Sequence, residues 1–152
     1  MSNINHPIFY ALVMLVAGLG IPVMATLNAG LGARLENPML ASTVLFVVAI
    51  VAAVTSLLVF QGVPKAPFAN SVPIHFYLGG FFVVFYVLSI TWIAPKFGVG
   101  NAVAFVLLGQ IISMAIIDHY RLMGAMHHPI SIQRFSGLVL MAVGVFLAVR
   151  RV

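Results

Sequence analysis

The sequence lacks cysteine and contains little charge: two acidic and seven basic residues in 152, or 6% of the chain. Without cysteine, a disulfide framework and thiolate metal sites are excluded. Ordinary soluble domains have about 25% charged residues. This chain is 63% hydrophobic, so a soluble fold could not hide its apolar surface. The basic residues are scattered without a Lys/Arg run, which is not the pattern of a nucleic acid-binding protein.

Apolar stretches without any Lys, Arg, Asp or Glu fill most of the chain. They cover residues 6–32, 38–62, 73–94, 97–117 and 135–149. A helix that crosses the hydrocarbon core of a bilayer needs about 20 apolar residues, and each stretch reaches or approaches this length. The sequence therefore predicts an all-α membrane protein that contacts the lipid bilayer, with five transmembrane helices in a single domain over residues 1–152.

The first apolar stretch could be mistaken for a secretory signal peptide. No Lys or Arg precedes it, and it is longer than the apolar region of a signal peptide. We therefore expect a retained first helix. An odd number of crossings then places the two chain termini on opposite sides of the membrane.

Lys/Arg asymmetry between the two faces normally sets the orientation of a membrane protein. Here the two faces would carry similar numbers of basic residues, namely Lys65, Arg121 and Arg134 against Arg34, Lys96, Arg150 and Arg151. The terminal amine makes the two counts equal. One interpretation is a weak preference for one orientation. The other is insertion in both orientations, which would let two copies of the chain meet upside down.

The residues expected of an enzyme or a metal site do not occur together. No apolar stretch carries an acidic residue in its middle, and no Ser, His and Asp are placed to act as nucleophile and base. His127 and His128 are adjacent but lack a third ligand. The sequence therefore predicts neither an enzyme nor a cofactor or metal site.

The first stretch contains a helix-breaking residue on one face. Gly18, Pro22 and Thr26 recur every four residues, and Asn28 lies near the same face. Pro22 has no backbone N–H, so the carbonyl one turn earlier loses its partner. One interpretation is a kinked helix that lines a substrate cavity. The alternative is a kink that serves packing, with Thr26 bonded back to its own helix.

The third stretch carries an aromatic stripe. Gly79, Phe82, Tyr86 and Ser89 fall on one helix face, and Gly80 adds a second small residue that allows another helix to approach. This stripe could stack on an organic substrate. The alternative is ordinary helix packing with aromatic anchoring at the membrane interface.

The fourth stretch carries polar residues toward its end. Gly109 and Ser113 form a small-xxx-small pair, and Gln110 presents an amide to the same side. These residues could line a pathway or bond to other helices. Asp118 is the acidic residue at a span boundary, where it could handle protons. Alternatively, it pairs with Arg121 across one helical turn.

Many of these residues belong to a pattern that runs along nearly the whole chain. It comprises residues 20–28, 79–82, Tyr86, 94–101, 109–113, 117–119, Pro129, Arg134, Gly137 and 144–147. Taken together, the pattern resembles the drug/metabolite transporter superfamily. It is most similar to the short five-helix branch, the YdcZ-like inner-membrane exporters.

The resemblance implies a transporter of a small organic molecule in the bacterial inner membrane. Long members of the superfamily join two five-helix halves in inverted orientation, and short members pair with a second chain. Substrate sits between the halves. With the aromatic stripe included, the predicted pathway residues are Pro22, Thr26, Asn28, Phe82, Tyr86, Gln110, Ser113 and Asp118. The predicted helix-packing residues are Gly18, Gly79, Gly80, Gly109, Gly137 and Gly144.

The chain departs from its four-helix multidrug relatives in one respect. Those exporters use a Glu in their first helix for proton exchange, whereas this chain has Thr26 and Asn28 in that region. A neutral, anionic or zwitterionic substrate, or a facilitated pathway, fits better than multidrug proton antiport.

The combined prediction is an exporter that works by alternating access as an antiparallel, dual-topology homodimer. Two alternatives stay open. The chain could be a subunit of a heterodimeric transporter with a sister chain. It could also be a lipid-handling or scaffold protein of the membrane without a transport role.

Overall fold

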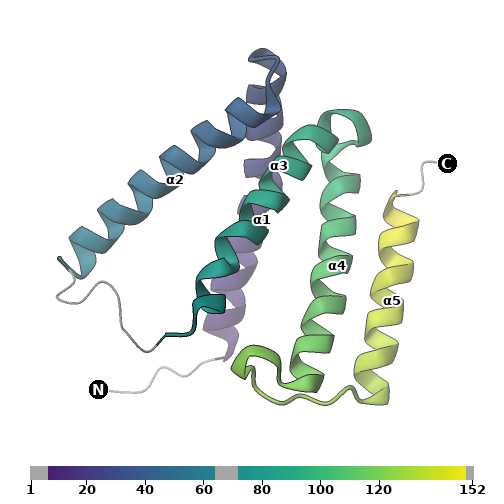
Figure 1. The fold of residues 1–152 in the computed structure, drawn as a ribbon. Coiled ribbons are helices and arrows are strands. Elements are labelled where there is room, and N and C mark those ends of the chain that lie inside the picture. Colours follow the sequence, from purple (N-terminus) through teal and green to yellow (C-terminus); the bar gives the residue numbers. More distant parts are fainter. Residues whose placement is uncertain (1–6, 64–71, 150–152) are drawn as a thin grey trace. The chain divides into compact units, whose positions relative to one another are not determined.

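The computed structural model describes residues 7–63 and 72–149, and all of its regular structure is helical (Figure 1). The long helices are α1 (Pro7–Arg34), α2 (Pro38–Phe60), α3 (Gly79–Phe97), α4 (Val99–Tyr120) and α5 (Ile132–Val149), with short 3-10 helices η1 (Ile74–Leu78) and η2 (Leu122–Gly124). Each of the five long helices can cross a membrane by its length and composition, η1 being counted with α3. The prediction of an all-α chain with five membrane-spanning helices is confirmed.

Four basic residues on which the sequence predictions drew lie outside the described residues. They are His6, the first residue of the first predicted span, and Lys65, Arg150 and Arg151, which entered the comparison of the two faces. The balance of charge between the faces therefore stays a prediction.

Local hydrogen bonds, rather than the first charged residue, set the helix ends. Helix α5 begins at Ile132, three residues earlier than predicted, because the Ser131 hydroxyl accepts a bond from the Arg134 N–H at 3.2 Å. Helix α3 continues through Pro95 and stops before Gly98, whose φ of +91° suits glycine alone. Gly98 is the one residue between α3 and α4.

A tight turn joins α1 to α2. Asn37 caps α2 by accepting a 3.0 Å hydrogen bond from the Leu40 N–H on its side-chain oxygen. Pro38 occupies the first helical position, where a missing N–H costs nothing. Glu36 reverses the chain with a left-handed φ of +51°. These residues fix where α2 departs from α1.

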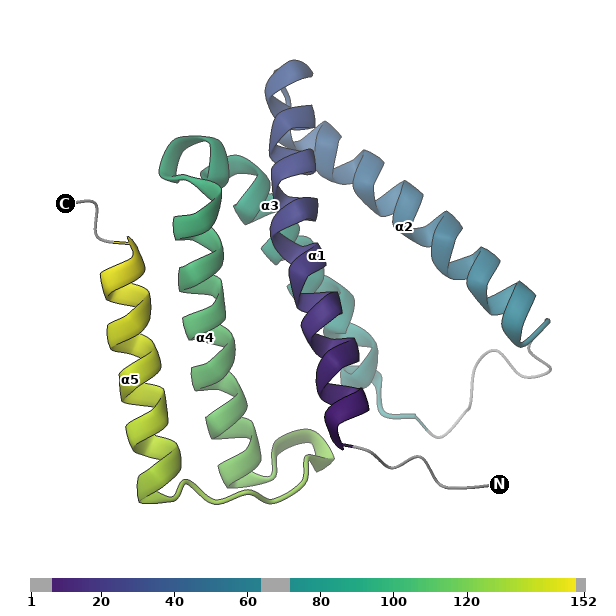
Figure 2. The ribbon, with the colours of Figure 1, turned by 180° about the vertical axis from the view of Figure 1, so that it is seen from behind.

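The chain divides into two compact units, Met1–Lys96 and Phe97–Val152. In the first unit, the buried residues gather where α1 ends, α2 begins and α3 ends. They are Ala25, Asn28, Ala29, Gly32, Ala41, Ser42, Val87, Ile90, Thr91 and Ala94. Away from this end α2 diverges from α1, as Figures 1 and 2 both show.

The diverging parts of the first unit leave long apolar surfaces uncovered. Every residue from Ile8 to Gly20 in α1 is exposed, as is every residue from Val47 to Phe60 in α2. In a bilayer such side chains face lipid tails or another protein at little cost, since lipid is as apolar as they are. The unit is thus held together at one end and open at the other.

Candidate functional site

A polar cluster joins the three long helices of the first unit at their buried end. The Asn28 amide donates a hydrogen bond to the Thr91 hydroxyl at 2.5 Å, and the Ser42 hydroxyl lies 3.3 Å from the same oxygen. Thr91 in turn donates to the Val87 carbonyl at 2.7 Å. The three side chains are only 1–4% exposed. In hydrocarbon a polar group needs a protein partner, so this cluster ties α1, α2 and α3 together.

Asn28, a predicted pathway residue, is therefore part of the packing of the first unit. It also lines a hollow of about 280 Å³ between α1 and α2, beside Met24 and Val48. The sequence reasoning missed Thr91 and Ser42. The available signal was a hydroxyl residue inside an apolar stretch, a residue type that bonds across membrane helices.

The Pro22 region forms an uninterrupted part of α1. The Thr26 hydroxyl donates to the Pro22 carbonyl at 2.8 Å, the bond back to its own helix that was considered above. Pro22 and Thr26 also line a shallow hollow of about 290 Å³ with Val23 and Leu27. The two predicted pathway residues thus share one surface of α1. The Thr26 hydroxyl hydrogen is engaged by the Pro22 carbonyl, so only the hydroxyl oxygen can accept a bond from another molecule.

The α3 stripe is largely uncovered at its start and covered toward its end. Phe82 is 76% exposed, whereas Tyr86 is half-buried. The Tyr86 hydroxyl oxygen is buried and has no hydrogen-bond partner in the described part of the chain. A polar atom in that position can be satisfied by a water, a ligand or a second chain.

The six predicted packing glycines share an open environment. Around Gly18, Gly79, Gly80, Gly109, Gly137 and Gly144, no described atom beyond the adjacent residues and the backbone of the same helix lies within 4 Å of the place where a Cβ would stand. The glycine that does allow close approach is Gly32, which the sequence reasoning missed. An added Cβ there would lie 3.3 Å from both Pro38 Cα and Thr91 Cγ2. Packing of the other six remains a prediction, and it requires another surface.

In α4, the predicted pathway residues Gln110 and Ser113 are exposed. Neither side chain forms a hydrogen bond with the described residues. Both lie within the span, so their polar groups would face lipid if no further protein surface or water-filled path met them.

Asp118 closes the loop between α4 and α5. Its carboxylate accepts a 2.5 Å bond from Arg134, and both side chains are only about a quarter exposed. Arg134 also donates to the His128 carbonyl at 2.9 Å, and the His128 N–H donates to the Asp118 carbonyl at 3.2 Å. The alternative that Arg121 pairs with Asp118 is wrong. Arg121 adopts a left-handed φ of +53° and ends α4.

The described residues contain no group of three His, Cys, Asp or Glu side chains that could hold a metal ion. His119 instead accepts a 3.3 Å bond from the Ile130 N–H on its Nδ1, so it stabilises the same loop as Arg134. The side chains of Asp118, His119 and Arg134 thus have local structural partners.

Comparison with known protein families gives a match over nearly the whole chain. The chain matches the family described as "Putative inner membrane exporter, YdcZ" over residues 9–147, nearly its whole length. Neither the curated proteins nor the solved structures contain a match. The matched range covers the five membrane-spanning helices, apart from the first residue of the first span and the last two of the fifth, and includes the residues on which the resemblance to this family was based. The chain therefore belongs to the YdcZ family of inner-membrane exporters.

Proposed function

We propose that this chain is one half of a small-molecule exporter, and that a second copy inserted upside down supplies the other half. The observation that carries the proposal is the set of polar groups in the spans that lack a partner. Gln110, Ser113 and the Tyr86 hydroxyl have no hydrogen-bond partner among the described residues. An unsatisfied polar group in hydrocarbon costs several kcal/mol, which favours a second protein wall or a water-filled path there.

The uncovered apolar surfaces support the same arrangement. Helix α2 is exposed from Val47 to Phe60, and the packing glycines of α1, α3, α4 and α5 face open space. Small residues on a membrane helix allow the backbone of another helix to approach closely. A second copy offers surfaces of the matching kind, since it carries the same glycines and the same open ends.

An inverted pair also supplies a route for alternating access. Transporters with inverted repeats bind substrate near the middle of the bilayer and rock one half against the other. The Asn28–Thr91–Ser42 cluster would keep one end of each first unit closed, while the diverging ends of α1 and α2 move. The pathway residues of the two copies would then face each other between the halves.

The substrate class follows from the charges in the spans. The chain has two acidic residues, Glu36 in the α1–α2 turn and Asp118 in the last turn of α4. Asp118 is neutralised by Arg134. With no acid in mid-span to attract a cation, the proposed path favours a neutral, anionic or zwitterionic molecule.

Orientation in the membrane is the sharpest test. Because the chain lacks cysteine, a single cysteine added after Val152 reports its own side without a background signal. Right-side-out and inverted vesicles are treated with a membrane-impermeant maleimide, and full labelling after detergent gives the total. Comparable labelling from both sides is expected. Labelling from one side alone would exclude the homodimer and leave the sister-chain heterodimer as the remaining exporter.

A further inference from the structure

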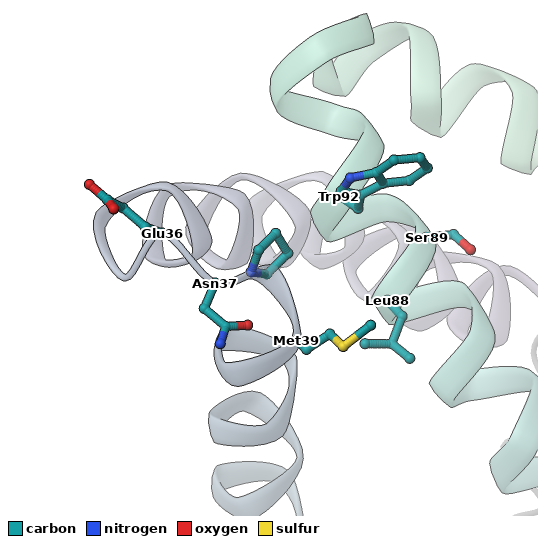
Figure 3. A pocket seen from close by; sticks show the side chains of 7 residues that line it. Glu36, Asn37, Met39, Leu88, Ser89 and Trp92 are labelled. Carbon is teal, nitrogen blue, oxygen red and sulfur yellow. The ribbon is translucent and has the colours of Figure 1, made fainter.

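Two adjoining hollows lie at the α1–α2 turn beside the polar cluster of the first unit, and Thr91 of that cluster lines one of them. The larger, of about 450 Å³, runs between the start of α2 and α3 and is lined by Met39 and Leu88 among others (Figure 3). The smaller, of about 310 Å³, extends to Lys96. Both hollows include Glu36 and Trp92. Each has a volume near or within the roughly 300–1,000 Å³ of small-molecule sites.

Opposite charges line the smaller hollow without pairing. Glu36 and Lys96 form no ion pair within the described residues, so their charged atoms lie more than 4.0 Å apart. Asp118, the other acid, is already paired. Lys96 instead places its ammonium 4.1 Å from the centre of the Trp92 ring. The Glu36 carboxylate points away from Met39 and Trp92 (Figure 3). A molecule that carries a positive and a negative group would therefore meet Glu36 at the outer edge of the hollow and Lys96 beside Trp92.

The larger hollow is mostly apolar and leads toward the lipid. Figure 3 shows Met39 of α2 and Leu88 of α3 reaching toward each other, with Ser89 and Trp92 on the same side of α3. Beyond Met39, α2 continues into its exposed apolar surface. Trp92 is 56% exposed near the end of a span, a position typical of the membrane interface. The site thus has a charged end at the membrane surface and an apolar end within the bilayer.

We infer that this end of the first unit binds one zwitterionic phospholipid. The lipid ammonium lies at Glu36, its phosphate lies at Lys96, and an acyl chain follows Met39 and Leu88. An anionic phospholipid without an ammonium group offers Glu36 no partner and brings a second negative charge close to it. The inference goes beyond the export function and does not rest on it, since all of these residues belong to the first unit of a single chain.

The test compares two lipids on the full-length protein. Detergent-solubilised protein is mixed with equal amounts of phosphatidylethanolamine and phosphatidylglycerol, and the first retained lipid is identified by native mass spectrometry. We expect a preference of about fivefold for phosphatidylethanolamine, the size of one interfacial ion pair. Glu36→Gln should abolish the preference, whereas Lys96→Gln should lower the retention of both lipids, since both carry the phosphate. Arg34→Gln is the matched control, since it removes a cation near the same turn that lines neither hollow.

Two results would overturn the inference directly. One is equal retention of both lipids by the unaltered protein. The other is an undiminished preference in Glu36→Gln together with undiminished retention of both lipids in Lys96→Gln. A third arm adds glycerophosphoethanolamine, which has the same headgroup charges and no acyl chains. We expect it to leave the bound lipid in place. Displacement of the lipid by this soluble molecule would show that the hollow recognises a free zwitterion, and the assignment to a phospholipid would be wrong.

Discussion

Arg134 at the start of α5 holds Asp118 at the end of α4 by a 2.5 Å bond from its guanidinium to the carboxylate. The same guanidinium bonds to the His128 carbonyl, so it fixes both the helix end and the loop. This pairing gives Asp118 a structural partner at the membrane boundary. The ion pair with Arg134 therefore accounts for an acidic residue at this position without a role in proton transfer.

The first prediction concerns this pair. Arg134→Gln should lower the free energy of unfolding by about 1.5–3 kcal/mol, because it leaves a partly buried carboxylate without its charged donor. Unfolding in mixed micelles, followed by circular dichroism, measures the loss. Asp118→Asn in the Arg134→Gln background should cost little more, since the two changes remove the same interaction.

Arg121→Gln is the control for the first prediction. Arg121 is exposed and forms no ion pair in the described structure, so its loss should leave stability unchanged. If Arg121→Gln destabilised the protein as much as Arg134→Gln does, the Asp118–Arg134 ion pair would not be the interaction that stabilises this loop.

The second prediction concerns the polar cluster. Thr91→Val keeps the shape of the side chain but removes the acceptor of the Asn28 amide, which is 4% exposed. An unpartnered buried amide should cost about 1–2 kcal/mol of unfolding free energy. Thr43→Val makes the same change at an exposed hydroxyl that bonds only to the Met39 carbonyl of its own helix. If the two variants had equal free energies of unfolding, the polar cluster would not stabilise the first unit.

The third prediction separates the glycines. Gly32→Ala places a Cβ 3.3 Å from the Pro38 backbone, which cannot give way easily, and should cost about 1–3 kcal/mol. Gly18→Ala meets open space and should leave stability unchanged or slightly higher, since alanine favours the helix. Thermal unfolding of both variants in detergent decides the matter. A tolerated Gly32→Ala would mean that the α1–α2 turn is looser than the structure has it.

The sequence alone predicted the membrane-spanning helices well because bilayer thickness fixes how long an uncharged stretch must be. It predicted their ends less well, since local caps set them: Ser131 starts α5, and the left-handed Arg121 ends α4. Charge could not reveal these positions. Helix α4 in fact continues through Asp118 and His119 before it stops.

Contacts between the helices were the part that the sequence could not supply. Asn28 and Thr91 are 63 residues apart, and the partner of Asp118 is 16 residues away rather than three. A helix in lipid can be apolar on all sides, so hydrophobic periodicity does not mark the face that meets a neighbour. The polar residues could be identified as candidates, but their partners depend on how the chain turns between the spans.

The last prediction tests the inverted pair by self-crosslinking. Gln110 lies near the middle of α4, so in an upside-down dimer the two copies of this residue meet at the same depth in the bilayer. Gln110→Cys should therefore form a disulfide-linked dimer with copper phenanthroline. Phe60, 84% exposed at the end of α2, lies near one membrane face. In an inverted pair its two copies are on opposite faces and roughly 30 Å apart.

Phe60→Cys should accordingly give no self-crosslink under the same conditions. In a pair of parallel chains both copies of Phe60 lie at one face, where their exposure makes a crosslink possible. Crosslinked Phe60→Cys dimers together with uncrosslinked Gln110→Cys would exclude the inverted arrangement. The reverse pattern is the one expected of an inverted contact in which α4 approaches its own copy, and such a contact places the exposed Gln110 amide between the two halves, where a substrate could reach it.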